Sequence, residues 1–528
     1  MRPPSLLPLC GILGLSSALT TAPNDVAIEN ANHIFNVIQD SMRQWGSSLH
    51  HNGVSFFLAS VPAGTQFYHG TSKATPVNGT QWLAFEPEHA MVFARPRHGP
   101  PPHSAPSPPE DADTEPQDGG HGELRKRKHH GPPADGPLKA FNESEAGYLH
   151  TYAAAKDLRL VYLDGMSAAK TDKGTLDSQD SILFNGLFED PSAPSGHGQE
   201  GERAKLACEI AENEWEGRID GVLRMEAGFE IILSSNTLKK NVDLEVTVNM
   251  DDEKHHDCHG LRKEDDGKRH GPGGPGGPRG PGGPRGPAGW MRAVTARYNG
   301  IGGNRVSLNF NNFVTAFSYD VELFLDNSTH PRLAYLSPEE RAALRSEVTN
   351  LVLTHNPADV SEDWQVITDL IITRYSNELS YFASGSIETI ERLQAEIDRV
   401  LSPFIDYSVR DDAAEIERCA THFLPASSLE GGSVAAHAVY GVSQKICSAL
   451  TEAAKEKELE SAVQVVQGLV DHLDWAKWKE CRGCAVNEIC VVPIWPLGTV
   501  QDYNNPKCKD ASSPYDRDGE SYWGGMHH

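Results

Sequence analysis

Residues Gly64 to Ala94, GTQFYHGTSKATPVNGTQWLAFEPEHAMVFA, carry the strongest structural signal in the chain. The alternating segment Gln66 to His69 predicts a strand, and Gly70 after it has no Cβ, so the backbone can turn tightly or approach a ligand closely. The apolar run Trp82 to Phe85 predicts a second strand. Pro87 then suits the first turn of a helix. We expect two strands and a short helix around a pocket.

This order, FYHGT followed by an aromatic strand and the helix EPEHAMVFA, resembles the ADP-ribosyltransferase superfamily. It is most similar to members with a histidine on the first core strand, such as the poly(ADP-ribose) polymerases. The segment 218–233, RIDGVLRMEAGFEIIL, resembles the part of that family that carries a glutamate on a later core strand. On this match Glu230 takes the glutamate position and Glu226 is the second choice. Residues 148–165 resemble the strands between the two motifs.

The resemblance implies an enzyme that breaks the bond between nicotinamide and ribose in NAD through an oxocarbenium-like state. His69 would hydrogen-bond the NAD ribose, and the backbone of Gly70 would hold the nicotinamide amide. Glu230 would bind a ribose hydroxyl and stabilise the developing positive charge. The ADP-ribose would pass to a protein or to water. The side chains that could supply a stacking face are Tyr68, Trp82 and Phe85.

The same residues have structural interpretations. His69 could be a hydrogen-bonded histidine at a strand end, Glu230 could pair with Arg224 or cap a turn, and Glu226 could be solvated. The aromatic side chains could belong to the core. The second hypothesis is therefore a non-catalytic secreted protein that uses a degenerate scaffold for structure or partner binding.

The sequence also departs from the family pattern. Ala84 and Phe85 stand where a serine, threonine or tyrosine is usual, and Phe93 stands where a tyrosine is common. These departures favour the non-catalytic alternative.

The composition limits the possible partners and the compartment. A formal net charge of −26 over 528 residues argues against a general affinity for nucleic acid or anionic membranes. Arg2, the apolar residues 6–15 and the small residues 16–18 predict a signal peptide over residues 1–18. Since no later run is long and apolar enough to span a bilayer, we expect a secreted protein.

Cysteines and glycosylation sequons fit that route. Without Cys10, eight of nine cysteines remain, and an even number in an oxidising compartment favours disulfides. The CRGC segment with Cys490 and Cys508 has irregular spacing for zinc, so we expect disulfides there and no metal site. The sequons lie at Asn78, Asn142 and Asn327.

Changes in composition and periodicity predict the domain organisation. An ADP-ribosyltransferase-like α+β domain with a split sheet is expected over 24–325, with disordered insertions at 97–138 and 251–289, which are rich in proline, glycine and charge. Helical periodicity then predicts an α-helical domain over 333–480. A Cys-rich tail, 481–528, completes the chain.

Individual elements were also predicted from periodicity. One helix is expected over 25–45, and a capping box at Ser337 begins another. Further helices are expected at 361–382, 386–401, 433–454 and 457–478. The alternation within 290–324 predicts two strands on either side of the turn 300–303.

Overall fold

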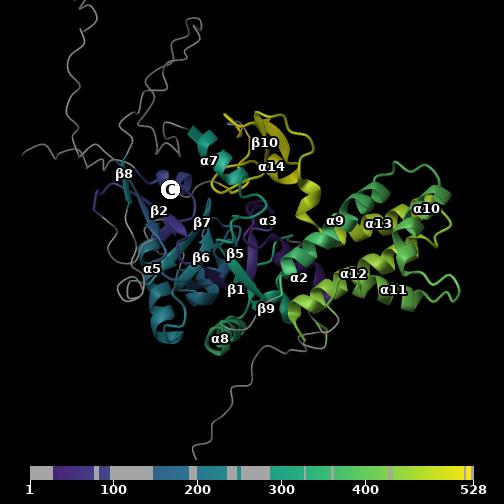
Figure 1. Ribbon diagram of the computed structural model, residues 1–528, viewed down its shortest axis with the longest axis horizontal. Coiled ribbons are helices and arrows are strands. Elements are labelled where there is room, and N and C mark those ends of the chain that lie inside the picture. Colours follow the sequence, from purple (N-terminus) through teal and green to yellow (C-terminus); the bar gives the residue numbers. More distant parts are fainter. Residues whose placement is uncertain are drawn as a thin grey trace, which may run out of the picture.

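The computed structural model of the chain describes residues 28–75, 82–94, 147–188, 199–234, 247–250, 286–325, 329–357, 362–425, 428–429, 432–515 and 519–524. It has one large mixed sheet, a group of long helices beside it and a small two-stranded sheet near the C-terminus (Figure 1). The predicted α+β class is confirmed. The predicted signal peptide, the 97–138 insertion, most of the 251–289 insertion and the three sequons lie outside the described residues.

The large sheet contains nine strands in the order β8-β4-β2-β3-β7-β6-β5-β1-β9. Their bounds are β1 (Asn52–Val61), β2 (Gln66–Thr71), β3 (Trp82–Ala84), β4 (Tyr148–Ala153), β5 (Leu158–Gly165), β6 (Gly221–Met225), β7 (Phe229–Leu233), β8 (Thr247–Met250) and β9 (Ser307–Thr315). The pair β5–β6 is parallel, and the other pairs are antiparallel. The strands predicted in and around the motif stretch are therefore confirmed.

Strands β2 and β3 share fewer paired residues than any other neighbouring strands of the large sheet. Strand β2 pairs with β4 at every position from Gln66 to Thr71, and β3 pairs with β7 at all three of its residues. Between β2 and β3 the register contains a single pair, Tyr68 with Ala84. The two halves of the sheet are thus joined at one point, close to the sequence motif.

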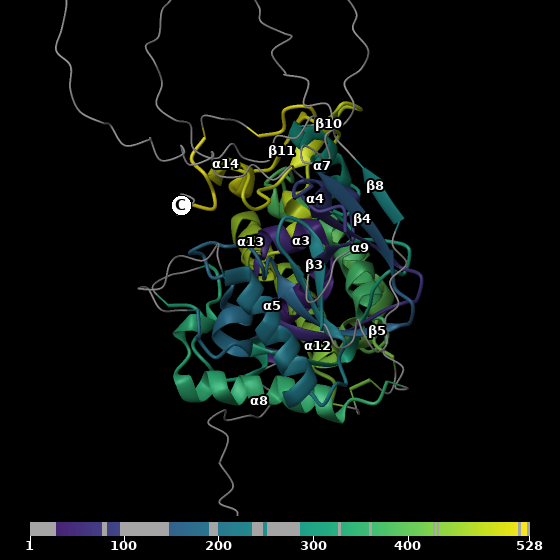
Figure 2. The ribbon, with the colours of Figure 1, turned by 90° about the vertical axis from the view of Figure 1, so that its left-hand side faces the viewer.

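The helices are α2 (Ala31–Asp40), α3 (Gln44–Leu49), α4 (Pro87–Met91), α5 (Glu200–Glu209), α7 (Gly286–Thr295), α8 (Pro338–Thr354), α9 (Trp364–Ala383), α10 (Ile390–Leu401), α11 (Asp412–Thr421), α12 (Val434–Ala453), α13 (Leu459–Leu473) and α14 (Val500–Asn504). Figure 1 shows α9 to α13 extending away from the sheet, and Figure 2 shows α5 and α8 at the end opposite to β10 and β11. The capping box at Ser337 is present, with Glu340 as its partner. The four later predicted helices are confirmed as α9, α10, α12 and α13.

Two predictions of secondary structure are wrong. The helix expected over 25–45 is interrupted, because Met42 has a left-handed backbone with φ of 58° and separates α2 from α3. The first strand expected in 290–324 is instead part of helix α7, and β9 pairs with β1 rather than forming a hairpin. Helix α7 has only 10 residues, which is too short for the pattern of apolar residues to separate the two periods, so tertiary packing decided.

Helices α2 and α3 both pack against the residues at and after the end of α13, and not only against the sheet. Asn36 of α2 donates to the carbonyl oxygen of Leu473 at 3.0 Å, and the indole of Trp45 donates to that of Ala476 at 3.1 Å. Phe35 stacks on Trp475 with the ring centroids 5.8 Å apart. The predicted domains 24–325 and 333–480 thus share a continuous apolar core in the described part of the chain.

The described residues form three disulfides, all in the C-terminal third of the chain. Cys419–Cys447 joins α11 to α12. Cys481–Cys490 and Cys484–Cys508 link the strands β10 (Glu488–Val491) and β11 (Lys507–Asp510) to the segment before them. The disulfides expected around CRGC are present. Cys208 is buried on α5 and its thiol donates to the carbonyl oxygen of Leu233 at 3.5 Å.

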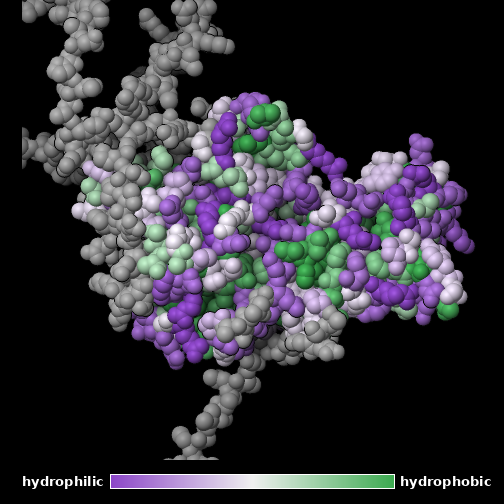
Figure 3. Space-filling view, viewed as in Figure 1, coloured by the Kyte–Doolittle hydropathy of each residue, from purple (hydrophilic) through white to green (hydrophobic). Residues whose placement is uncertain are grey.

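The face drawn in Figure 3 mixes polar and hydrophobic residues, and a large hydrophobic patch lies around α2 and α9. On α9, Val366 and Leu370 are 51% and 52% exposed. Among the described residues, none of the helices has the length and apolar character needed to cross a membrane.

His50 contacts both Asp40, at the end of α2, and Asp474, directly after α13. Its Nδ1 lies 2.6 Å from a carboxylate oxygen of Asp40, and its Nε2 lies 3.3 Å from one of Asp474. Burial acts to lower the pKa of His50, but the hydrogen bonds to the two aspartates outweigh it and raise the pKa to about 10. The charged imidazolium therefore bridges two carboxylates at neutral pH.

This bridge predicts a pH dependence of stability. Because the folded pKa of about 10 is above the unfolded value of 6.5, the contribution of His50 is complete below pH 6.5 and is lost as the pH rises to 10. Relative to His50→Asn, we expect wild type to be about 1.5–3 kcal/mol more stable at pH 6, the range for hydrogen bonds to charged groups. Urea unfolding at pH 6, 8 and 10 measures this difference, and a difference that stays constant with pH contradicts the assignment.

Candidate functional site

The register of the sheet decides which motif side chains share a face. Tyr68 pairs with Ala84, and Ala84 pairs with Glu230, which pairs with Arg224 on β6. Because paired residues point to the same side of a sheet, these four side chains lie on one face. His69, the next residue on β2, starts from the other face. The structure therefore brings Glu230 and His69 to the same junction from opposite sides.

His69 is anchored at the junction by a backbone group of β3. Its Nδ1 donates to the carbonyl oxygen of Trp82 at 2.9 Å, since a carbonyl can only accept. Burial lowers the pKa of His69, although this hydrogen bond acts in the opposite direction, so the ring is neutral at pH 7. Nε2 of that tautomer is a hydrogen-bond acceptor. His69 can therefore accept a hydrogen bond from a hydroxyl group.

Gly70 is required by close packing. A Cβ at this position would lie 1.8 Å from the carbonyl oxygen of Ala90 on α4 and 2.8 Å from the backbone nitrogen of Ala94. Helix α4 thus lies directly on β2, which only a residue without a side chain permits.

Trp82 is the centre of an aromatic group at the junction. Its ring centroid lies 5.0 Å from that of His69, 5.8 Å from that of His89 and 4.8 Å from that of Phe93. The rings of Trp82 and His89 are stacked with 28° between their planes, whereas Phe93 meets Trp82 edge-on. Trp82 is partly exposed and Phe93 is 43% exposed, so both can contact a ligand.

The two other aromatic candidates do not join the ring group around Trp82. Phe85 is fully buried and packs edge-on against Phe67, with ring centroids 4.9 Å apart. The hydroxyl of Tyr68 donates to the side chain of Gln66 at 3.2 Å. Phe85 thus takes part in the core, and Tyr68 lies on the Glu230 face but bonds along its own strand.

Glu230 is paired with Arg224, as in the structural interpretation of the sequence. Nε of Arg224 donates to Oε1 of Glu230 at 2.8 Å, and both side chains are only 2% exposed. The same guanidinium donates to Gln179 at 2.6 Å and to Glu200 at 2.7 Å. Gln179 belongs to the π-helical turn η2 (Asp177–Leu183). Arg224 thereby fixes the position of Glu230 from several elements.

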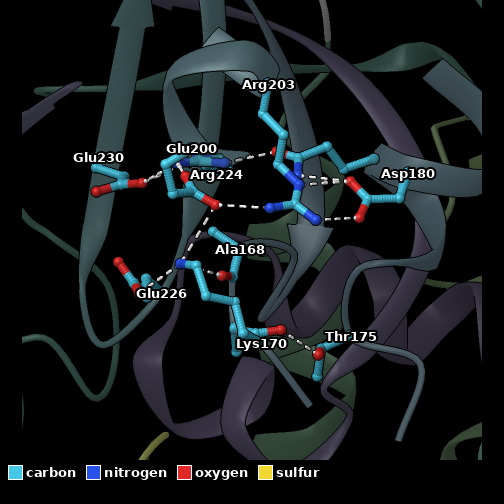
Figure 4. Close-up of polar contacts among 11 residues, drawn as sticks. Ala168, Lys170, Thr175, Asp180, Glu200, Arg203, Arg224, Glu226 and Glu230 are labelled. Carbon is cyan, nitrogen blue, oxygen red and sulfur yellow. Dashed lines mark hydrogen bonds and ion pairs between the residues drawn. The ribbon is translucent and has the colours of Figure 1, made fainter. Parts of the chain in front are cut away.

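Glu200, at the first position of α5, connects the Arg224 group to Lys170 (Figure 4). Its second oxygen lies 3.4 Å from Nζ of Lys170 and 3.2 Å from Arg203. Lys170 in turn donates to Glu226 at 2.8 Å. Figure 4 shows the carboxyl groups of Glu226 and Glu230 on the same side of this network. The two candidate glutamates therefore lie in one connected group of charges.

The charges in this network determine its protonation. Burial raises the pKa of Glu230 to about 7, although Arg224 opposes this shift. Burial would also raise the pKa of Glu200, but the charges of Arg224 and Lys170 outweigh burial and lower this pKa to about 2. Glu200 is therefore ionised at neutral pH, whereas Glu230 titrates close to neutrality, as expected of an acid or base group.

His89 on α4 completes the group. One of its ring nitrogens, one carboxylate oxygen of Glu226 and one of Glu230 all lie within 4.8 Å of one another. This is a possible ligand set for a cation, but Lys170 and Arg224 already neutralise the two carboxylates. Burial lowers the pKa of His89 to about 4, so it is neutral. The sulfurs of Cys481, Cys484 and Cys508 are in disulfides and are not available to zinc.

Several of these residues were missed from the sequence. His89 lies within the motif stretch, but nothing in the order of residues distinguishes it from a surface histidine at a helix end. Glu200 and Lys170 lie 30 and 60 residues from Glu230, in segments without a recognisable motif. Only tertiary structure brings them to the glutamates.

The family match covers the part of the chain that contains β1 to β8 of the large sheet. Residues 20–264 match the family described as the YPL277C N-terminal domain. Two uncharacterised proteins of Saccharomyces cerevisiae, YOR389W and YPL277C, are each 32% identical to this chain over 219 residues. The aligned part is 40% of this chain and spans 32% of YOR389W and 41% of YPL277C. No solved structure matches the chain.

Proposed function

We propose that the protein binds NAD at the junction of β2 and β3 and releases nicotinamide, passing ADP-ribose to a protein or to water. The observation that carries this proposal is the grouping of Trp82, His89, Glu226 and Glu230 at the one point where the two halves of the sheet meet. A partly exposed ring next to buried carboxylates suits a ligand that has a flat cationic ring bonded to a sugar.

Glu230 has the central role in this proposal. Both contacts with Arg224 use Oε1, so Oε2 is the atom that we assign to a ribose hydroxyl. As the bond to nicotinamide breaks, positive charge develops on the ribose, and a fixed carboxylate in a dry site stabilises it. Arg224 holds the carboxylate in place before the substrate binds, so little reorganisation is needed.

His69 and Trp82 would position the substrate. Trp82 offers its face to the nicotinamide ring, and Nε2 of His69 would accept a hydrogen bond from a ribose hydroxyl that extends past the junction, on the face opposite to Glu230. A dinucleotide stacked on Trp82 also lies next to His69, because the rings of the two residues lie 5.0 Å apart. Secretion is part of the proposal, and the three disulfides support an oxidising compartment.

A second candidate function is non-catalytic. The buried ion pair between Arg224 and Glu230 favours it, because a carboxylate in such a pair can serve the fold alone. On this alternative the junction is an inherited scaffold that supports structure or the binding of a partner protein.

Nicotinamide release from NAD by the purified, disulfide-intact protein separates the two functions. Release above the rate of buffer alone, together with NAD binding by calorimetry, is the expected result. If neither is observed, the catalytic proposal is wrong and the scaffold alternative stands. Binding without release indicates a nucleotide-binding protein.

A further inference from the structure

Arg297 is a buried cation without a partner. It follows α7 and is only 1% exposed, and its nitrogens Nε, Nη1 and Nη2 all lack hydrogen-bond partners among the described residues. Buried guanidinium groups are normally paired, since an unsatisfied charged donor carries the full cost of its desolvation. An arrangement of this kind suggests a ligand that completes it.

A second unsatisfied group lies next to it. Nδ1 of His89 is buried and likewise has no hydrogen-bond partner within the part of the chain that the structure describes. A Cβ on Gly228 would lie 2.9 Å from Nη2 of Arg297 and 2.9 Å from Nδ1 of His89, so both nitrogens lie against the same glycine in the β6–β7 turn. Two different elements, α4 and the segment after α7, thus direct unused polar atoms toward one place.

Nearby carboxylates do not satisfy the guanidinium. Glu86 instead binds Arg305 at 2.6 Å, and Glu226 binds Lys170. Glu86 and Glu88 act on Arg297 only as distant charges, and burial is the main cause that lowers its pKa to about 10. Arg297 therefore stays charged at neutral pH, and none of the residues with described positions forms an ion pair with it.

We propose that Arg297 and His89 form a binding site for a phosphoryl group. A guanidinium has five N–H donors in a planar fork, and His89 adds a further nitrogen. One carboxylate satisfies two donors of such a fork, whereas a phosphoryl group has three terminal oxygens that accept from both residues. The group enters after a local opening at α4 or at the Gly228 turn, because the three nitrogens of Arg297 are closed off in this structure. This inference does not require NAD cleavage.

Inorganic phosphate is the first probe, and thermal unfolding is the readout. We expect phosphate to raise the midpoint of unfolding of wild type more than that of Arg297→Met, and acetate at equal ionic strength to affect both alike. Phosphate also stabilises folded proteins in general. Because this general effect is equal in wild type and variant, the difference between their responses reports binding at Arg297. Without phosphate, Arg297→Met is expected to be as stable as wild type or more stable, because it removes an unpaired buried charge. Arg292→Met, an exposed position on α7, is the matched control and should retain the full phosphate response.

The proposal is wrong if phosphate raises the unfolding midpoint of wild type and of Arg297→Met by the same amount. It is also wrong if the variant is less stable than wild type by the same amount with and without phosphate. If Arg297→Met does not fold, Arg297→Lys replaces it, with an expected loss of about tenfold in phosphate affinity because lysine lacks the planar fork. Titration with ADP-ribose then identifies the source of the group. Tighter, Arg297-dependent binding of ADP-ribose than of phosphate assigns the site to a nucleotide, and equal or weaker binding assigns it to free phosphate. Absence of nicotinamide release leaves these outcomes unchanged.

Discussion

Replacing Glu230 with glutamine is expected to lower the rate of nicotinamide release by about 10²–10³-fold, the usual effect of removing one preorganised electrostatic group. Glutamine has the same shape and can still accept from Arg224 through its amide oxygen, so the fold should be retained. It cannot carry the negative charge that opposes the charge developing on the ribose. The loss should therefore appear in kcat, with a much smaller change in KM.

The pH profile gives a second readout of the same residue. Burial raises the pKa of Glu230 to about 7, and the ionised form is the one that stabilises a cation. Activity should therefore rise as the pH increases through 7, and Glu230→Gln should lose this rise.

Glu226→Gln is the matched control, because Glu226 lies in the same network and pairs with Lys170. A loss of less than about tenfold is expected from a group that does not touch the reacting atoms. If Glu226→Gln loses more activity than Glu230→Gln, the assignment of the two glutamates is reversed.

Arg224→Met is expected to lower the free energy of unfolding by about 3–5 kcal/mol, the range for removing one partner of a buried ion pair. The guanidinium and Glu230 are both 2% exposed, so water cannot replace the lost contacts. Gln179 and Glu200 lose a donor in the same step. Because these residues come from four elements, the loss should affect the whole sheet region. Urea unfolding followed by circular dichroism measures it.

A second substitution tests the origin of that loss. In the double variant Arg224→Met with Glu230→Met, the uncompensated carboxylate is absent, so part of the stability should return. Arg292→Met, on the exposed side of α7, is expected to change stability by less than about 0.5 kcal/mol. A cost below about 1 kcal/mol for Arg224→Met would mean that the pair is not a determinant of the fold.

The sequence by itself determined most local elements. Alternation over 66–69 and the short, aromatic-rich apolar run at 82–85 predicted β2 and β3, because short apolar runs bounded by turn residues favour strands over helices. Pro87 and the capping box at Ser337 located the starts of α4 and α8, because these signals act within one turn of helix. The resemblance brought Glu226 and Glu230 forward as candidates, and Arg224 was already recognised as a possible structural partner.

Only the tertiary structure decided the arrangement of charges. Lys170, Glu200 and Arg224 meet because β6, α5 and the loop after β5 converge, and no local pattern encodes contacts between residues 24 or more positions apart. The break at Met42 and the helical state of 286–295 also depend on packing, since their sequences are compatible with more than one period. The unpaired guanidinium of Arg297 is invisible in the sequence for the same reason: burial and the lack of a partner are properties of the fold.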